Sequence, residues 1–269
     1  MSFLSLLAIC RNEEKTIARF LRSHIDIVDE VVLVDTGSTD QTLKIALEFP
    51  VNIKQIPWED DFSKARNYAF HVARGDWFLL LDIDEIICPD DIHKVIPLAK
   101  LDTYDVVNFK LHHFHVDYER IPADKDFAWS SVKTRVTNKS CLIRNQPGIF
   151  YRGMVHESIV YPQDAVVRSY NSSIRVGHYR DKKTLSDRAM YYHDLEKRSV
   201  IEEWENTNAH YNFVQTKCLN NDREAVCWAL NKMRHIERRF RAGFEDLYGK
   251  MCELGWDQEA DRLHELLND

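Results

Sequence analysis

Residues 75–85 read GDWFLLLDIDE, and this stretch decides the fold class. Its apolar run, Trp77–Leu81, has the length of a strand that is covered on both faces, as strands of parallel sheets are. Two acidic residues, Asp82 and Asp84, follow where that strand would end. Because ligands of such sheets bind at the carboxyl ends of the strands, the stretch predicts an α/β fold with a polar site.

The same alternation of strand-like and helical segments fills the first hundred residues. Three more apolar segments come before Trp77, at residues 3–9, 31–34 and 51–56. Helical patterns lie between them, including one over residues 62–74 that ends at a glycine. This β-α-β-α-β-α-β order predicts a doubly wound, mostly parallel sheet with helices on both faces.

Two polar residues are predicted to start the first two helices. Asn12 offers an N-cap acceptor to a helix that buries Ile17 and Phe20 on one face. Ser38 and Gln41 have the spacing of a capping box ahead of the second helix.

The chain changes character after about residue 101. Residues 102–178 predict short strands and irregular loops that are rich in His, Arg and aromatic side chains, a composition suited to a binding surface. From residue 184 the sequence is polar, helically periodic and free of proline, which predicts three or four helices. We therefore expect one domain over residues 1–180, in two halves that meet near residue 100, and a helical C-terminal module over 181–269.

Composition excludes several classes of protein. A chain of 269 residues, 44% of them hydrophobic, suffices for one large domain with a small appendage. The net charge of −7 does not favour bulk binding of nucleic acid, and six cysteines without a CxxC pair indicate reduced thiols rather than a zinc site. No apolar run reaches the roughly 18 residues of a spanning helix, and the first 14 residues do not resemble a signal peptide. We expect a cytoplasmic protein, with a peripheral position at the inner membrane surface as an alternative.

Three polar clusters follow three of the predicted strands, at residues 10–14, 35–40 and 82–85. Parallel strands bring their carboxyl ends to one edge, so these clusters are expected to converge. Within the third cluster, one of Asp82 and Asp84 can bind a divalent ion while the other orients a hydroxyl or a water molecule, since Mg²⁺ and Mn²⁺ prefer oxygen ligands. The alternative is a polar cluster that only caps a helix.

Four segments in this order resemble family 2 glycosyltransferases of the GT-A fold: AICRNEE at 8–14, VVLVDTGSTDQT at 31–42, DFSKARNYAF at 61–70 and GDWFLLLDIDE at 75–85. The segments Arg144–Ile149 and Gly153–Glu157 are similar to those of a subgroup that includes bacterial lipopolysaccharide-core glycosyltransferases. The resemblance implies a metal-dependent, inverting transfer from a nucleotide-diphosphate sugar, with UDP-sugars favoured and Mn²⁺ or Mg²⁺ as cofactor. It places the donor in residues 1–100 and the acceptor in 101–180. It specifies neither the sugar nor the acceptor, which could be a glycan, a lipid-linked glycan, a protein or a modified nucleic-acid base.

The resemblance also implies roles for single residues of the donor site. Asp35 matches an acidic residue that accepts a hydrogen bond from the base, and Arg66 matches a basic residue near the nucleotide; a helix cap and a solvated helix residue are the alternatives. Asp82 matches the acidic residue near the donor ribose or sugar, and Asp84 the metal ligand. The other donor-site residues are Cys10, Arg11, Asn12, Glu13, Gly37 and Ile83.

Two further positions concern the metal and the acceptor. His178 follows an apolar segment where GT-A enzymes often supply one more metal ligand, although a structural histidine fits the pattern too. An inverting transfer needs a base for the acceptor proton, and Glu157 is the candidate carboxylate. His156 could orient Glu157, bind the metal or act as the base itself. Alternatively, Glu157 pairs with Arg152 or Arg144.

A basic run near the C-terminus could contact an anionic surface or a nucleic acid, with three of its arginines on one helical face by spacing. It consists of Lys232, Arg234, Arg238, Arg239 and Arg241. A solvated helix face is the alternative interpretation.

Two other classes of protein compete with the glycosyltransferase. A haloacid-dehalogenase-type phosphatase also uses an Asp-X-Asp pair, but directly after its first strand, whereas Asp82 follows three β-α units. A catalytically inactive, glycosyltransferase-like binding or scaffold protein would be expected to lose the acidic pair. A dinucleotide-dependent oxidoreductase is excluded because the sequence has no G-x-G-x-x-G.

Overall fold

The computed structural model describes residues 3–116, 135–181, 184–203, 205–233, 236 and 240–268. The chain divides into two compact units. The first unit comprises Met1–Glu59, Lys64–Phe150 and Ile159–Asp187, and the second comprises Asp60–Ser63, Tyr151–Ser158 and Arg188–Asp269. Two short segments from residues 1–180 therefore belong to the second unit. A functional division of the chain at residue 180 stays a prediction.

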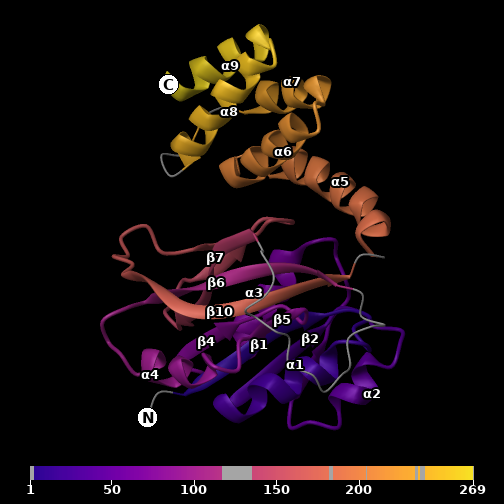
Figure 1. The fold of residues 1–269 in the computed structure, drawn as a ribbon, viewed down its shortest axis with the longest axis vertical. Coiled ribbons are helices and arrows are strands. Elements are labelled where there is room, and N and C mark those ends of the chain that lie inside the picture. The colour runs from indigo at the N-terminus through magenta and orange to yellow at the C-terminus, as the bar shows by residue number, and fades with distance from the viewer. Residues whose placement is uncertain are drawn as a thin grey trace. The chain divides into compact units, whose positions relative to one another are not determined.

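An eight-stranded mixed sheet forms the centre of the first unit, in the order β3-β2-β1-β4-β7-β6-β10-β5 (Figure 1). Strands β3, β2, β1 and β4 pair in parallel, β6 pairs in parallel with β10, and β7 runs antiparallel to β4 and β6. The predicted α/β class, with a mostly parallel sheet, is confirmed. The strands are β1 (Leu4–Cys10), β2 (Glu30–Asp35), β3 (Asn52–Gln55), β4 (Trp77–Leu80), β5 (Glu85–Ile87), β6 (Val106–Val116), β7 (Arg135–Arg144) and β10 (Ser169–Asp181). A second, two-stranded sheet pairs β8 (Phe150–Arg152) with β9 (Ser158–Val160).

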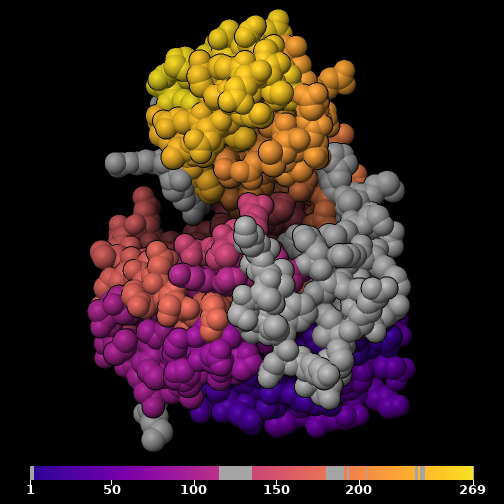
Figure 2. Space-filling model, in the orientation of Figure 1, coloured from indigo at the N-terminus to yellow at the C-terminus, as the bar shows by residue number. Residues whose placement is uncertain are grey.

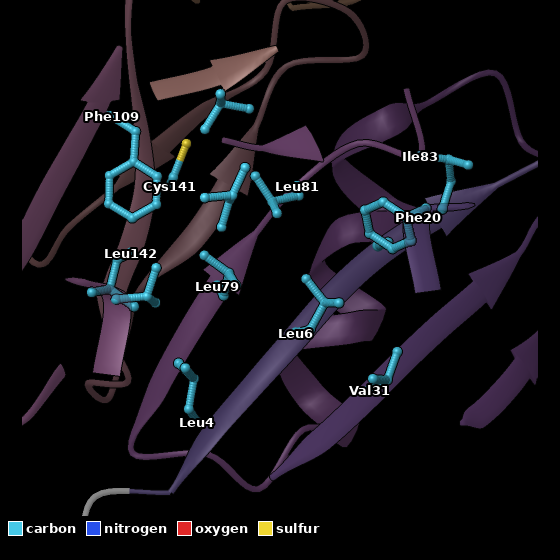
Figure 3. Packing of buried hydrophobic residues seen from close by; sticks show 14 of the residues in the cluster. Leu4, Leu6, Phe20, Val31, Leu79, Leu81, Ile83, Phe109, Cys141 and Leu142 are labelled. Atoms are coloured by element: carbon cyan, nitrogen blue, oxygen red, sulfur yellow. The ribbon is translucent and has the colours of Figure 1, made fainter. Parts of the chain in front are cut away.

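The core of the first unit lies against the central strands (Figure 3). Leu6 of β1, Leu79 of β4 and Phe109 of β6 are completely buried, as is Phe20 of the first helix. Burying each such side chain contributes about 1.5–3 kcal/mol relative to leaving it exposed. The helices of this unit are α1 (Ile17–His24), α2 (Thr42–Ala46), α3 (Phe62–Val72) and α4 (Val95–Ala99).

The first helix begins later than its sequence predicts. Asn12 does not cap it, because α1 starts at Ile17 with Thr16 at the N-cap position. Asn12 has a left-handed φ of +57°, and its side-chain oxygen accepts a hydrogen bond from the backbone N–H of Thr39 at 2.8 Å. The asparagine therefore connects two loops at the edge of the sheet instead of starting a helix.

The capping box predicted from Ser38 is also wrong. Helix α2 starts at Thr42, and the backbone N–H of Thr42 donates to Asp40 at 2.9 Å. The Ser38 hydroxyl donates instead to Asp35, at the end of β2. The same hydroxyl oxygen accepts the backbone N–H of Asn12 at 2.9 Å, so contacts within its own turn and with the loop after β1 take the side chain that a helix start would have used.

Residues 102–178 contain longer strands than predicted. β6 has 11 residues, β7 has 10 and β10 has 13. In β6, the buried Phe109 and Leu111 alternate with Asn108 and Lys110, which lie closer to solvent. The polar members of this alternation interrupt the apolar runs, and for that reason the sequence suggests loops.

The described part of the second unit contains five helices, whereas the sequence predicts three or four. They are α5 (Thr184–Glu202), α6 (Thr207–Leu219), α7 (Arg223–Lys232), α8 (Arg241–Glu253) and α9 (Asp257–Asn268). The first residues of α5 belong to the first unit. Asn206 and Asp222 cap α6 and α7 through side-chain bonds to backbone N–H groups. Helix α6 packs on α7 and α8 on α9 around a core that includes Phe213, Phe244 and Leu263. The orange and yellow atoms of these helices form one compact body (Figure 2). Among the described helices, none is long and apolar enough to cross a membrane.

Candidate active site

Asp82 stands between two basic side chains at the end of β4. Arg66 of α3 donates to Asp82 Oδ1 at 2.7 Å, and Lys139 of β7 donates to Asp82 Oδ2 at 2.9 Å. Lys139 also donates to Glu85 at 2.6 Å, and the same Glu85 oxygen accepts the backbone N–H of Asp82 at 2.9 Å. Two carboxylates and two cations thus form a connected, formally neutral cluster, which we call the Asp82 cluster.

The surroundings of the Asp82 cluster shift the pKa of its members in different directions. Burial opposes ionisation of Asp82, but the charges of Arg66 and Lys139 outweigh it and hold the pKa of Asp82 well below its ordinary value. Burial raises the pKa of Glu85, whose side chain is only 1% exposed, and the neighbouring Asp82 raises it further against the opposing charge of Lys139. Burial alone would lower the pKa of Lys139, but the two carboxylates raise it. The lysine therefore stays charged.

Asp84 contacts a different partner. Its Oδ2 lies 3.1 Å from Nε2 of His178, which β10 places beside β5. The His178 side chain is 11% exposed and that of Asp84 is 28% exposed. The structure therefore brings together two pairs of residues that the sequence predicts for one site: Arg66 with Asp82, and Asp84 with His178.

The Asp84–His178 pair fits one side of a divalent-ion site. Two ligands at 90° around an octahedral Mg²⁺, each about 2.1 Å from it, would be about 3.0 Å apart. The observed separation of 3.1 Å between Asp84 Oδ2 and His178 Nε2 agrees with that value. Among the residues that the structure describes, no group of three or more His, Cys, Asp and Glu could hold a metal ion. Such a pair suits an ion that completes its shell with phosphate oxygens and water, as Mg²⁺ commonly does.

Asp35 is completely buried at the end of β2. Its carboxylate accepts hydrogen bonds from the backbone N–H groups of Gly37 at 3.1 Å and Ser38 at 3.2 Å, and from the Ser38 hydroxyl. The thiol of Cys10 donates to it at 3.7 Å. Burial, with a smaller contribution from Asp35, raises the pKa of Cys10, so this thiol keeps its proton. Gly37 has a φ of +101°, a conformation that favours glycine in this turn.

The other predicted donor-site residues differ in exposure. Arg11 and Asn12 are exposed in the loop after β1, and Glu13 is half-buried. Ile83 is 4% exposed and its side chain packs in the core (Figure 3). Only the backbone of Ile83 is therefore suited to contact a ligand.

His156 and Glu157 lie in the second unit. Met154 and Val155, which directly precede His156, pack against Leu195 of α5 and so anchor this segment. His156 is exposed, Glu157 is half-buried, and His156 has a φ of +53° that is uncommon outside glycine.

Contacts with α5 and α6 hold His156 in this conformation. Its Nε2 lies 3.0 Å from Oε1 of Glu196, and its carbonyl oxygen accepts a bond from the Asn208 side chain at 2.6 Å. Glu196 is itself 3.9 Å from Lys217, whose side chain is 6% exposed. A carboxylate thus orients the imidazole, an arrangement that sets which ring nitrogen carries the proton.

Only part of the basic run belongs to the described residues. Arg234, Arg238 and Arg239 lie outside them. Lys232 ends α7 and Arg241 begins α8, so one helix does not carry both. The predicted helical face of Arg234, Arg238 and Arg241 lies outside the described residues at its first two positions and stays a prediction.

The order of strands and the acidic pair at the end of β4 define a GT-A fold. The family model for glycosyl transferase family 2 matches residues 5–160. This match covers more than half of the chain, which belongs to that family. The family predicted from the sequence motifs is confirmed.

Several known proteins are similar to the chain. A TPR repeat-containing protein of Synechococcus elongatus is 33% identical over 159 residues, which make up 59% of this chain and 36% of the relative. An uncharacterized glycosyltransferase of Rickettsia felis is 26% identical over 260 residues, 93% of this chain and 85% of the relative. The chain thus spans about a third of the first relative and most of the second. Among solved structures, glucosyl-3-phosphoglycerate synthase from Mycobacterium tuberculosis in complex with Mn²⁺, UDP-glucose and phosphoglyceric acid has a TM-score of 0.37 and 22% identity, over 41% of this chain and 44% of that one.

Proposed function

We propose that this chain transfers a sugar from a nucleotide-diphosphate sugar, with UDP-sugars favoured, to an acceptor, and that Mn²⁺ or Mg²⁺ assists the transfer. The observation that carries the proposal is that two neighbouring carboxylates, Asp82 and Asp84, have different partners. Asp82 is neutralised by Arg66 and Lys139, whereas Asp84 and His178 present an oxygen and a nitrogen at the spacing of two metal ligands. Membership of the family supports the class of reaction.

On the donor side, Asp84 and His178 would hold the divalent ion, which supplies positive charge to the departing diphosphate when it is bound. Arg66 and Lys139 orient Asp82 toward the donor ribose or sugar. Asp35 accepts a hydrogen bond from the base, and Cys10 at the end of β1 lines the nucleotide together with the loop of Arg11, Asn12 and Glu13. Preorganised charges such as those of the Asp82 cluster favour the transition state because they need no rearrangement during the reaction.

On the acceptor side, the base comes from His156 or Glu157. The bond to Glu196 favours His156, because a ring that donates from Nε2 keeps the lone pair of Nδ1 for a proton. Glu157 is the carboxylate next to it and is half-buried. A positioned base of either kind typically contributes about 10²–10⁴-fold to the rate.

The test of the overall function is nucleotide release from a panel of UDP- and GDP-sugars with Mn²⁺ or Mg²⁺. Wild-type protein should release nucleotide, and Asp84→Asn should lower turnover by roughly two to three orders of magnitude, the loss typical of one electrostatic stabilising group. Asp164→Asn, at an exposed loop position, is the matched control and should keep wild-type turnover. Full activity in excess chelator would refute the metal dependence. A folded wild-type protein that binds UDP but releases no nucleotide from any donor would instead indicate a binding protein.

The acceptor base is tested by comparing three variants in the same assay. His156→Gln, Glu196→Gln and Glu157→Gln should all keep UDP affinity by calorimetry. If His156 is the base, the first two variants lose transfer activity and Glu157→Gln keeps it. The opposite result assigns the proton to Glu157, and lost UDP affinity in any variant would contradict an acceptor-side role for that residue.

A further inference from the structure

The hydrogen bonds at His178 continue away from Asp84 into two residues of the sheet. His178 Nδ1 lies 3.2 Å from Nδ1 of His113 on β6. His113 Nε2 lies 2.9 Å from the hydroxyl of Thr137 on β7. A chain of three bonds thus runs from Asp84 through both rings to a threonine, across the neighbouring strands β10, β6 and β7.

The register of the strands produces this chain. His113 pairs directly with His178 in the parallel ladder of β6 and β10. Their ring centroids are 5.3 Å apart at an angle of 56°. Both rings and Thr137 are at least half-buried, so their orientations are set by packing as well as by hydrogen bonds.

With both rings neutral and no ion bound, these bonds allow one placement of the protons. An ionised Asp84 accepts, so His178 donates from Nε2 and its Nδ1 accepts. His113 must then donate from Nδ1, and its Nε2 accepts the proton of the Thr137 hydroxyl.

An ion on His178 Nε2 requires the opposite placement. The lone pair of Nε2 then faces the ion, so the proton of the His178 ring is on Nδ1 and points at His113. Nδ1 of His113 accepts it, and Nε2 of His113 donates to the oxygen of Thr137. A threonine hydroxyl can both donate and accept, so the same three residues complete either arrangement.

We propose that His113 and Thr137 are positioning residues that select the tautomer and ring orientation of His178 for binding a divalent ion. This inference rests on the proposed function, because it takes Asp84 and His178 as the residues that hold the ion. Outer partners of a metal-binding histidine typically account for 10–100-fold in metal affinity. His113 and Thr137 tune the ion site through His178, without contacting the ion.

The test is a titration of the full chain with Mn²⁺ in the presence of UDP, in which electron paramagnetic resonance measures free Mn²⁺. His113→Leu should weaken Mn²⁺ binding by about 10–100-fold. His113→Asn should restore most of the affinity, because its side-chain oxygen can accept the proton of His178 Nδ1. Thr137→Val and Thr137→Ser form a second pair with the same expected loss and rescue. His112→Asn is the matched control, since the adjacent residue of a strand faces the opposite side of the sheet.

A spectroscopic measurement separates positioning from a general structural effect. In ¹⁵N-histidine spectra, Mg²⁺ with UDP should move the proton of His113 from Nδ1 to Nε2. Unchanged tautomers on addition of Mg²⁺, or wild-type Mn²⁺ affinity in His113→Leu, would overturn the inference, as would an Asn variant as weak as the Leu variant. If Asp84→Asn lowers Mn²⁺ affinity and His113→Leu does not, only this inference fails. If wild type binds no Mn²⁺, or Asp84→Asn binds it normally, the proposed ion site fails and the inference with it.

Discussion

His24, at the end of α1, makes the first unit sensitive to acid. It is completely buried, its Nδ1 lies 2.8 Å from the carbonyl oxygen of Phe20, and its Nε2 lies 3.2 Å from the backbone nitrogen of Ile87 on β5. The carbonyl must accept and the backbone N–H must donate, so the ring is neutral with its proton on Nδ1. Burial lowers the pKa of His24 from 6.5 to about 4, against a smaller opposing effect of the Phe20 bond.

The sign of the resulting pH dependence follows from this lowered pKa. The unfolded chain takes up a proton at His24 near pH 6.5 and the folded chain only near pH 4, so stability is complete above 6.5 and falls as the pH drops toward 4. At about 1.4 kcal/mol per pH unit, the whole interval is worth about 3 kcal/mol. Between pH 7 and pH 5 the loss should be about 2 kcal/mol, a large part of the stability of a typical domain.

Urea unfolding at pH 7 and pH 5 measures this loss. Wild type should lose about 2 kcal/mol more than His24→Gln over that interval, because glutamine can accept the Ile87 N–H but takes up no proton. His71→Gln, at an exposed position of α3, is the control and should follow wild type. If wild type and His24→Gln show parallel pH dependence, the assignment of a neutral, proton-excluding His24 is refuted.

Three further predictions concern Lys139, Gly75 and Asp35 of the first unit, with controls elsewhere in the chain. Lys139→Met leaves the buried Glu85 without its cation and should cost about 3–5 kcal/mol in urea unfolding, whereas the exposed Lys110→Met should cost little. In Gly75→Ala, the new Cβ would lie 2.5 Å from the Trp77 carbonyl oxygen, so thermal unfolding should show a loss above about 2 kcal/mol. In Gly249→Ala, the new Cβ would meet no atom within 4 Å beyond the adjacent backbone of its own helix, so stability should instead rise by about 0.5–1 kcal/mol. Asp35→Ala should weaken UDP binding by about 1–3 kcal/mol by calorimetry, and an unchanged affinity would limit Asp35 to holding its own turn.

The parts of the fold that could be predicted from the sequence are those with a local signal. Strands β1, β2 and β4 are continuous apolar runs because other elements cover both of their faces, and such runs are visible in the sequence. β6 and β10 carry polar side chains at alternate positions, so their length depends on partners distant in the sequence. The predicted helix starts were wrong for a related reason, since the loops of Asn12 and Ser38 bond to each other rather than to the first turn of a helix.

The residues of the candidate site also differ in whether the sequence around them carries a local signal. Asp82 and Asp84 directly follow a buried strand, and that position alone indicates a ligand site at the edge of a parallel sheet. Lys139 lies 57 residues from Asp82 in the sequence and reaches it only because β7 lies next to β4. A lone lysine shortly before the apolar end of β7 was the available signal, and it is weak without the strand order. No motif surrounds His113 or Glu196, so the sequence predicts neither His113 beside His178 nor Glu196 beside His156.

If Asp35 accepts a hydrogen bond from the nucleobase, as proposed, the turn that holds it affects the kinetics of nucleotide binding. Its carboxylate has no exposed surface, and Gly37, Ser38 and Cys10 already donate to it. A nucleobase can donate to this carboxylate only after the turn has opened. The observed association rate therefore levels off at the opening rate as nucleotide concentration rises. The apparent affinity is then reduced by the fraction of molecules that are open, and an open fraction of about 1% weakens it about a hundredfold. Substitutions at Ser38 that loosen the turn would thus tighten nucleotide binding without adding a contact to the nucleotide.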